Sequence, residues 1–129
     1  MSNKDMFRAI IDRSITEVTI PSSITTIGSG AFGGCTQLTE ITIPSEINTI
    51  QSLAFSDQTS TISFTSMVFK QPSGATVSLP SAGSTSGMVY SKVAKEVNIY
   101  TDNETIKNYA WATDNVTATF YHLDGSAWE

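Results

Sequence analysis

The sequence predicts a β-rich α/β solenoid, a chain wound into stacked coils of about 23 residues. Three observations predict this fold. Two consecutive segments are near copies of each other, each copy holds a strand-like alternation of apolar and polar residues, and a proline ends the strand of each copy. The 129 residues suit one domain, residues 1–129, and 40% hydrophobic residues allow a modest core.

The repeat appears when residues 15–37 are laid over residues 38–60 without gaps, because 13 of 23 positions are then identical. Residues 18–20 and 41–43 alternate as half-buried strands, and we expect these strands to lie side by side. Phe32 and Phe55 are expected to close their coils from the far side. Each coil has an apolar face that it cannot bury alone, so the stack is the unit of stability.

Repeats are assigned to residues 14–66, with a third coil that begins at Thr61 and places Ile62 and Phe64 on its strand. The return segment of this coil does not repeat the pattern. Residues 67–96 form an irregular Ser/Gly-rich insertion, and we expect its stretches at 71–74 and 81–87 to form a mobile loop.

Both ends of the chain are expected to cap the solenoid. Residues 1–13 form an N-terminal cap, in which an amphipathic spacing predicts a short helix on Met6, Phe7, Ile10 and Ile11. Residues 97–129 form a C-terminal strand–helix–strand cap. Its strands are predicted at 97–100 and 116–123, and its helix begins after Asp102 as N-cap, with Ile106, Tyr109 and Ala110 on one face.

Composition disfavours several classes of function. The net charge is −5 and the seven Lys and Arg are scattered, so we expect no nucleic-acid partner. No run approaches the roughly 20 apolar residues that span a bilayer, so no membrane insertion is expected. The start lacks a secretory signal, so we expect synthesis in the host cytoplasm. If the protein works outside a cell, we expect that other means deliver it or that it is part of a longer chain.

The segment ITEVTIPSSITTIGSGAFGGCTQL, at residues 15–38, resembles the BspA-type leucine-rich repeat family. The second copy departs from that pattern at Gln51 and Gln58, where the family usually has Gly and Cys. Residues 97–112, with Trp111, are more weakly similar to the family's terminal element. The resemblance implies a leucine-rich-repeat solenoid that recognises or adheres rather than catalyses.

Repeats of this family occur in bacterial surface proteins, secreted microbial proteins and phage structural proteins. We rank first a phage or prophage virion component, such as a tail, fibre or capsid-decorating protein, located in the virion. It would contact virion proteins or further copies of itself. The alternative is a bacterial surface adhesion module, part of a longer exported chain, that binds a host protein or glycan.

The exposed stripe of the first strands supplies four candidate binding residues: Glu17, Thr19, Glu40 and Thr42. Neighbouring strands lie about 4.8 Å apart, which would set Glu17 beside Glu40. One interpretation is a site for a cation or a basic partner, and the other is a solvated face. Ser63 and Thr65 are expected to continue the stripe on the third strand.

The C-terminal third is rich in aromatic residues, and Tyr90 and Trp128 are further binding candidates. A capping core is the alternative interpretation for Tyr109 and Trp111. Trp128 lies next to the last residue, where a large apolar group requires something to hold it. A partner chain is one such support.

An enzyme is the third hypothesis and the least favoured. Glu17 and Glu40 match the spacing of a retaining glycosidase, but a flat sheet face offers no cleft. The single cysteine, Cys35, is interpreted as a packed thiol, and no motif pairs it with His122. No metal-binding spacing is present, so we expect no catalytic residues, no metal and no cofactor.

Overall fold

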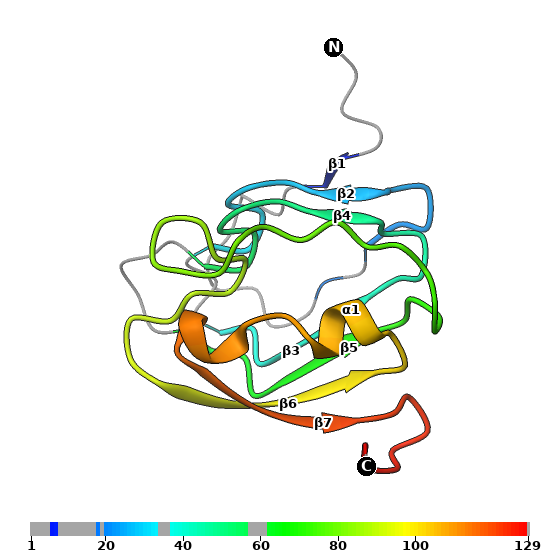
Figure 1. Cartoon of the computed structure of the whole chain (residues 1–129). Helices are drawn as coiled ribbons and strands as arrows, with labels where there is room; N and C mark the ends of the chain where they lie inside the picture. The colour runs from blue at the N-terminus through cyan, green and yellow to red at the C-terminus, as the bar shows by residue number, and fades with distance from the viewer. Residues whose placement is uncertain (1–5, 8–17, 19, 34–36, 57–61, 129) are drawn as a thin grey trace.

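The computed structural model in Figure 1 describes residues 6–7, 18, 20–33, 37–56 and 62–128. The chain is a β-solenoid of about four turns. Its strands form two parallel sheets, which Figure 1 shows as two layers with the interior between them. Each complete coil crosses from one sheet to the other and returns.

The first sheet has three short strands in the order β1-β2-β4. They are β1 (Met6–Phe7), β2 (Thr26–Ile27) and β4 (Thr49–Ile50). The second sheet has four strands in the order β3-β5-β6-β7. They are β3 (Glu40–Ile43), β5 (Ser66–Phe69), β6 (Lys95–Thr101) and β7 (Val116–Tyr121). A short helix α1 (Glu104–Lys107) and a 3-10 helix η1 (Trp111–Asp114) lie between β6 and β7 in the chain.

The two copies of the repeat stack as the sequence predicts. Thr26 in β2 pairs with Thr49 in β4, and these two residues hold the same position in the two copies. The rings of Phe32 and Phe55 lie parallel, with centroids 5.7 Å apart and an interplanar angle of 11°. They are 1% and 2% exposed, which confirms that the coils share one dry interior. Such aromatic pairs stabilise by about 1 kcal/mol beyond the area they bury.

The bends recur at the same positions of each copy. In the first two coils the turn after the strand closes through hydrogen bonds from Ile24 N–H to Pro21 O and from Ile47 N–H to Pro44 O, each 3.1 Å. At the opposite bend, Gly30 has φ +76°. The equivalent residue of the second copy is Leu53, which has φ 58°. Residues other than glycine rarely adopt this backbone conformation.

Val18 and Ile20 lie near β3. Val18 and Ile20 line a hollow of about 300 Å³ together with Thr42, Pro44 and Lys70. Ile20 is buried and Val18 half-buried. Thr19 is outside the described residues, so strand pairing between 18–20 and 41–43 stays a prediction.

The third strand starts later than predicted. Glu40 pairs with Ser66, so Met67 and Phe69 rather than Ile62 and Phe64 are the inward residues of β5. The prediction was wrong because Ile62 and Phe64 also alternate with polar residues. Phe64 is buried instead before the strand and meets Phe55 edge to face, with centroids 6.0 Å apart.

The segment between β5 and β6 packs as the return half of a third coil. Val77, Met88 and Val89 are buried in the common core. The carbonyl of Gly87 accepts from Leu53 N–H, and that of Met88 from Phe55 N–H, both at 2.8 Å. Ser78 adds a parallel bridge to Thr49 in β4. The segment is therefore irregular in secondary structure and ordered in its packing.

The described part of residues 1–13 does not form the predicted N-terminal helix. Met6 and Phe7 form the strand β1, which pairs in parallel with β2. Parallel pairing makes β1 the third strand of the sheet that contains β2 and β4, which a helix at this position would not do. Ile10 and Ile11 lie outside the described residues. That the first residues cap the solenoid stays a prediction.

The C-terminal elements follow the predicted order of strand, helix and strand, but the N-cap is Asn103 rather than Asp102. Asn103 is buried and its amide is fully paired. Its Oδ1 accepts from Thr105 N–H at 3.0 Å and Ile106 N–H at 3.2 Å. Its Nδ2 donates to Pro72 O at 2.9 Å and to Ala75 O at 3.0 Å. Asparagine fits because one side of its amide caps the helix and the other holds the neighbouring coil's turn.

Of the predicted helix face, Ile106 is buried and Tyr109 half-buried, while Ala110 is exposed because α1 ends at Lys107. Strand β7 begins at Val116 as predicted and ends at Tyr121 rather than at Leu123. Figure 1 shows α1 on the side of the four-stranded sheet that faces the three-stranded sheet.

Asn103→Ala is expected to lower the free energy of unfolding by about 2–4 kcal/mol, since it removes the helix cap and leaves two carbonyls without their donor. Asn103→Asp should be at least as harmful, because a carboxylate would then face those carbonyls. Urea denaturation measures both variants. Equal stability of Asn103→Asp and the original chain would contradict the role of the Nδ2 donor.

Candidate functional site

The outward face of the four-stranded sheet is a continuous surface of polar and aromatic side chains. Successive residues of a strand point to opposite faces, so the strand register sets which outward residues are neighbours. One row across the sheet consists of Glu40, Ser66, Asn98 and Thr119, and the next consists of Thr42, Val68, Tyr100 and Tyr121. We call these two rows the sheet face.

An aromatic pair lies at the β6–β7 end of the sheet face. The rings of Tyr100 and Tyr121 stack with centroids 5.0 Å apart and an interplanar angle of 20°. Both residues are half-buried. A stacked tyrosine pair offers a rigid amphipathic contact area, and tyrosines of this kind are enriched where proteins bind one another.

The structure places two of the four predicted stripe residues on the sheet face. Glu40 and Thr42 are exposed on β3. Glu17 and Thr19 lie outside the described residues, so the placement of Glu17 beside Glu40 stays a prediction.

The continuation of the stripe differs from the sequence prediction. Ser66 and Val68 stand beside Glu40 and Thr42, in place of Ser63 and Thr65. The cause is the later start of the third strand. Thr42 consequently shares a row with the tyrosine pair.

Tyr90 is not among the residues of the sheet face. It is half-buried in the segment before β6, and its hydroxyl accepts from Asn115 Nδ2 at 3.4 Å. The same Nδ2 donates to Ser91 O at 2.8 Å. Tyr90 therefore belongs to a contact that ties this segment to the turn before β7.

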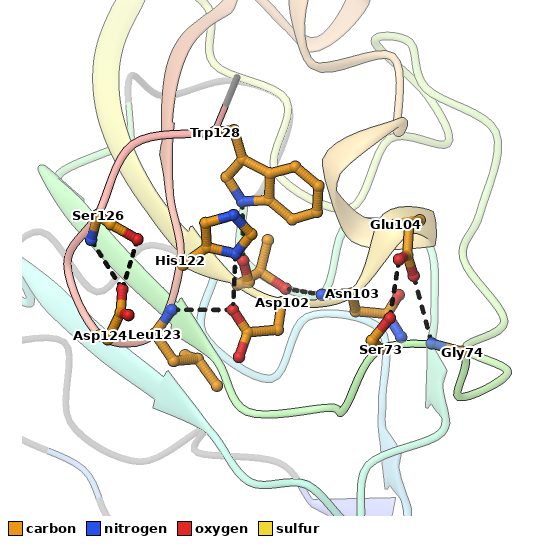
Figure 2. Close-up of polar contacts among 11 residues, drawn as sticks. Ser73, Gly74, Asp102, Asn103, Glu104, His122, Leu123, Asp124, Ser126 and Trp128 are labelled. Atoms are coloured by element: carbon orange, nitrogen blue, oxygen red, sulfur yellow. Dashed lines mark hydrogen bonds and ion pairs between the residues drawn. The ribbon is translucent and has the colours of Figure 1, made fainter.

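Trp128 is held by its own chain, as Figure 2 shows. Its Nε1 donates to Thr101 O at 2.9 Å, and its ring stacks on His122 with centroids 4.3 Å apart. His122 Nδ1 lies 2.9 Å from Asp102 Oδ1, which also accepts from Leu123 N–H at 3.1 Å. Asp102, expected as a helix cap, instead anchors the C-terminal tail.

A second carboxylate links α1 to the turn of the preceding coil by hydrogen bonds (Figure 2). Glu104 accepts from Ser73 Oγ at 2.8 Å and from Gly74 N–H at 3.2 Å. The hydrogen bond from Ser73 is the main cause that lowers the pKa of Glu104. The carboxylate is thus favoured in the charged form, which is the form that accepts both bonds.

A groove runs beside β7 and meets the sheet face at Thr119 and Tyr121. It consists of two adjoining hollows of about 460 and 400 Å³ that share Lys107, Ala118 and Phe120 in their lining. Trp128 borders one hollow and Trp111 the other. We call this feature the β7 groove.

Lys107 lies between two aromatic rings of the β7 groove. Its Nζ is 5.3 Å from the centroid of Phe120 and 5.4 Å from that of Trp128. Cation–π contacts of this kind contribute about 0.5–2 kcal/mol. Among the residues that the structure describes, no carboxylate lies within ion-pair distance of this ammonium group.

Behind the groove, a buried carboxylate organises three segments. Asp114 accepts from Tyr109 Oη at 2.6 Å, Gly83 N–H at 2.7 Å and Val89 N–H at 3.3 Å. Burial is the main cause that raises the pKa of Asp114, and the hydrogen bonds oppose it. A Cβ atom on Gly87 would lie 1.9 Å from Asp114 Oδ1, so only glycine fits there.

Within the described ranges, no three His, Cys, Asp or Glu side chains come together in a way that would hold a metal ion. None of the described helices is long and apolar enough to cross a bilayer. Glu40, the described member of the suggested carboxylate pair, lies exposed on the sheet face. Cys35 lies outside the described residues.

Sequence reasoning counted Tyr100 and Tyr121 among the C-terminal aromatic residues but missed their pairing, and it missed the position of Lys107. Tyr100 and Tyr121 both stand at outward positions of alternating strands, and that shared position was a usable signal. Lys107 had no such signal, because its position between Phe120 and Trp128 depends on how the tail folds back.

A comparison with protein-family models found that the family described as BspA type Leucine rich repeat region (6 copies) matches residues 4–121. No curated protein and no solved structure matched the chain.

The raised pKa of Asp114 gives a test of its burial. A carboxyl group with a folded-state pKa above its ordinary value of 3.8 destabilises the fold when ionised, and that cost disappears as pH falls through the folded pKa. The original chain should therefore gain stability relative to Asp114→Asn between about pH 7 and about pH 4. Urea denaturation across this range measures the difference.

Asp124→Asn is the matched control, because hydrogen bonds from Ser126 lower the pKa of Asp124. Its stabilising effect is fully present above its ordinary pKa of 3.8 and is lost only below it, so its profile should stay flat between about pH 7 and about pH 4. Parallel pH profiles for both variants would show that Asp114 is not a desolvated carboxyl group.

Proposed function

Since the chain belongs to the BspA-type leucine-rich repeat family, we propose that it is a non-enzymatic binding module that contacts another protein through its sheet face. Repeats of this family act as binding scaffolds and generally mediate protein–protein interaction. The stacked pair of Tyr100 and Tyr121, on the outward side of adjacent strands, is the observation that carries the proposal.

The chemistry of the sheet face supports binding rather than catalysis. Its outward residues Glu40, Asn98 and Thr119 are exposed side chains on an open sheet. Catalytic carboxylates need surroundings that separate their pKa values, and water on an open face supplies none. The tyrosine pair, by contrast, keeps two large rigid rings at the surface. Such rings commonly lie at the centre of protein–protein contacts.

In its finer form, the proposed role is that of a phage or prophage virion component, such as a tail, fibre or capsid-decorating protein. Its partners would be other virion proteins or copies of itself, and its location the virion. The family resemblance and the aromatic sheet face support this role, since assembly needs a rigid and repeatable contact surface.

A bacterial surface adhesion module that binds a host protein or glycan is the second candidate. The rows of hydroxyl and amide groups next to Tyr100 and Tyr121 favour it, because sugars bind by stacking on aromatic rings and by hydrogen bonds. The genes beside the coding sequence separate the two candidates. Capsid and tail genes are expected for the first, and wall-anchored surface proteins for the second.

A photo-crosslinking residue, p-benzoylphenylalanine, at position 121 tests the sheet face directly. In the organism that makes the protein, we expect it to yield an adduct with one main partner, identified by mass spectrometry. The same group at Thr105, exposed on α1, is the control and should not yield that adduct. Equal labelling from both positions, or none from 121, would count against the proposal.

Tyr121→Ala is expected to weaken binding to that partner by about 2 kcal/mol, or roughly 30-fold, because a central tyrosine contact is lost. Calorimetric titration measures the loss. Tyr90→Ala removes the same type of side chain away from the sheet face and should leave the affinity within about twofold. A thermal melt of each variant shows whether it is folded.

A further inference from the structure

The last coil of the solenoid leaves part of its inward face uncovered. On β6, the inward residues Val97 and Ile99 are 2% and 0% exposed. On β7, the residues paired with them, Ala118 and Phe120, are only half-buried. The difference arises because β7 stacks against β6, whereas among the described residues no full strand stacks against the other side of β7.

The end of this edge already pairs with a second segment of backbone. Residues after β7 turn back, with Gly125 N–H donating to His122 O at 2.9 Å and His122 N–H to Ser126 O at 2.7 Å. Ala127 then forms an antiparallel bridge with Tyr121. The tail therefore occupies the last position of the edge in the way that an added strand would, and this bridge does not extend to Val116–Phe120.

The charge of the groove defines what would complement it. Lys107 is half-buried between Phe120 and Trp128, and no described carboxylate pairs with it. An ammonium group in this position favours a carboxylate in the groove. The neighbouring wall is apolar and small at Ala118 and Ala112, which leaves room for an aliphatic side chain.

We infer that the β7 groove binds an extended acidic peptide segment of another protein by strand addition. The segment would pair with the free edge of β7, place an aliphatic side chain over Ala118 and Phe120, and set a Glu or Asp carboxylate against Lys107. Strand addition supplies main-chain hydrogen bonds, and the groove supplies the side-chain preference. The two surfaces meet at Thr119 and Tyr121, so the Lys107 variants, which leave the sheet face unchanged, distinguish the two assignments.

The probe is a synthetic peptide, acetyl-Thr-Glu-Thr-Val-Thr-Glu-Thr-amide, in which Val and both Glu share one face of the strand, titrated into the full chain labelled with nitrogen-15. We expect amide shifts to concentrate on β7 and α1. A peptide with Lys in place of both Glu residues should bind at least about fivefold more weakly. A peptide N-methylated at every residue should not bind, because it has no N–H group to donate to β7.

Lys107→Gln should weaken binding of the acidic peptide about threefold to tenfold, in line with one partly exposed ion pair. Lys107→Glu should reverse the preference between the acidic and the lysine peptides. Lys92→Gln removes a cation from an exposed loop residue and should change little. The methylated peptide is titrated into the original chain, so this test does not depend on whether the Lys107 variants fold.

Several outcomes would overturn the inference. They are shifts centred on β3 and β5, equal binding of the methylated peptide, and equal binding of the acidic and lysine peptides. Concentration-dependent self-association that is blocked by Lys107→Glu, without peptide binding, would assign the groove to a second copy instead. Shifts at Trp128 caused by an acidic oligosaccharide and not by the peptide would assign it to a glycan.

Discussion

Burial of one coil by the next is the constraint on which the rest of the structure depends. Each coil contributes few apolar side chains, and they lose contact with water only where a neighbouring coil covers them. The ring column of Phe32, Phe55 and Phe64 shows how this works, with successive centroids 5.7 and 6.0 Å apart. Parallel strand pairing on both sides keeps the coils in the register that this packing requires.

Where the repeat is regular, sequence reasoning predicted the structure well. The fixed period of the repeat predicted the stacking of the two coils and the shared interior of Phe32 and Phe55, because identical residues at a fixed period must take equivalent positions. The short strands β2 and β4 were not predicted. The strands β6 and β7 were also located, since long alternation between turn residues is a strong signal.

The misses occur where the period breaks. The third strand was placed too early because nothing in the sequence marks the extra residues that precede β5. Asn103 and Asp102 are equivalent as caps by composition, and only the neighbouring carbonyls of Pro72 and Ala75 select the amide. The candidate surfaces were partly missed for the same reason, since Lys107 and Trp128 meet through a tail whose path is a tertiary property.

The lengths of chain that separate paired residues along the four-stranded sheet are uneven. The stretch from Ser66 to Asn98 is the longest and that from Asn98 to Thr119 the shortest, yet Glu40 and these three residues stand in one row. The extra length is taken up in the return segments, away from the row. Insertions and deletions in the return segments can thus change that side of the solenoid while the sheet face keeps its geometry. The two sides are therefore free to evolve separately.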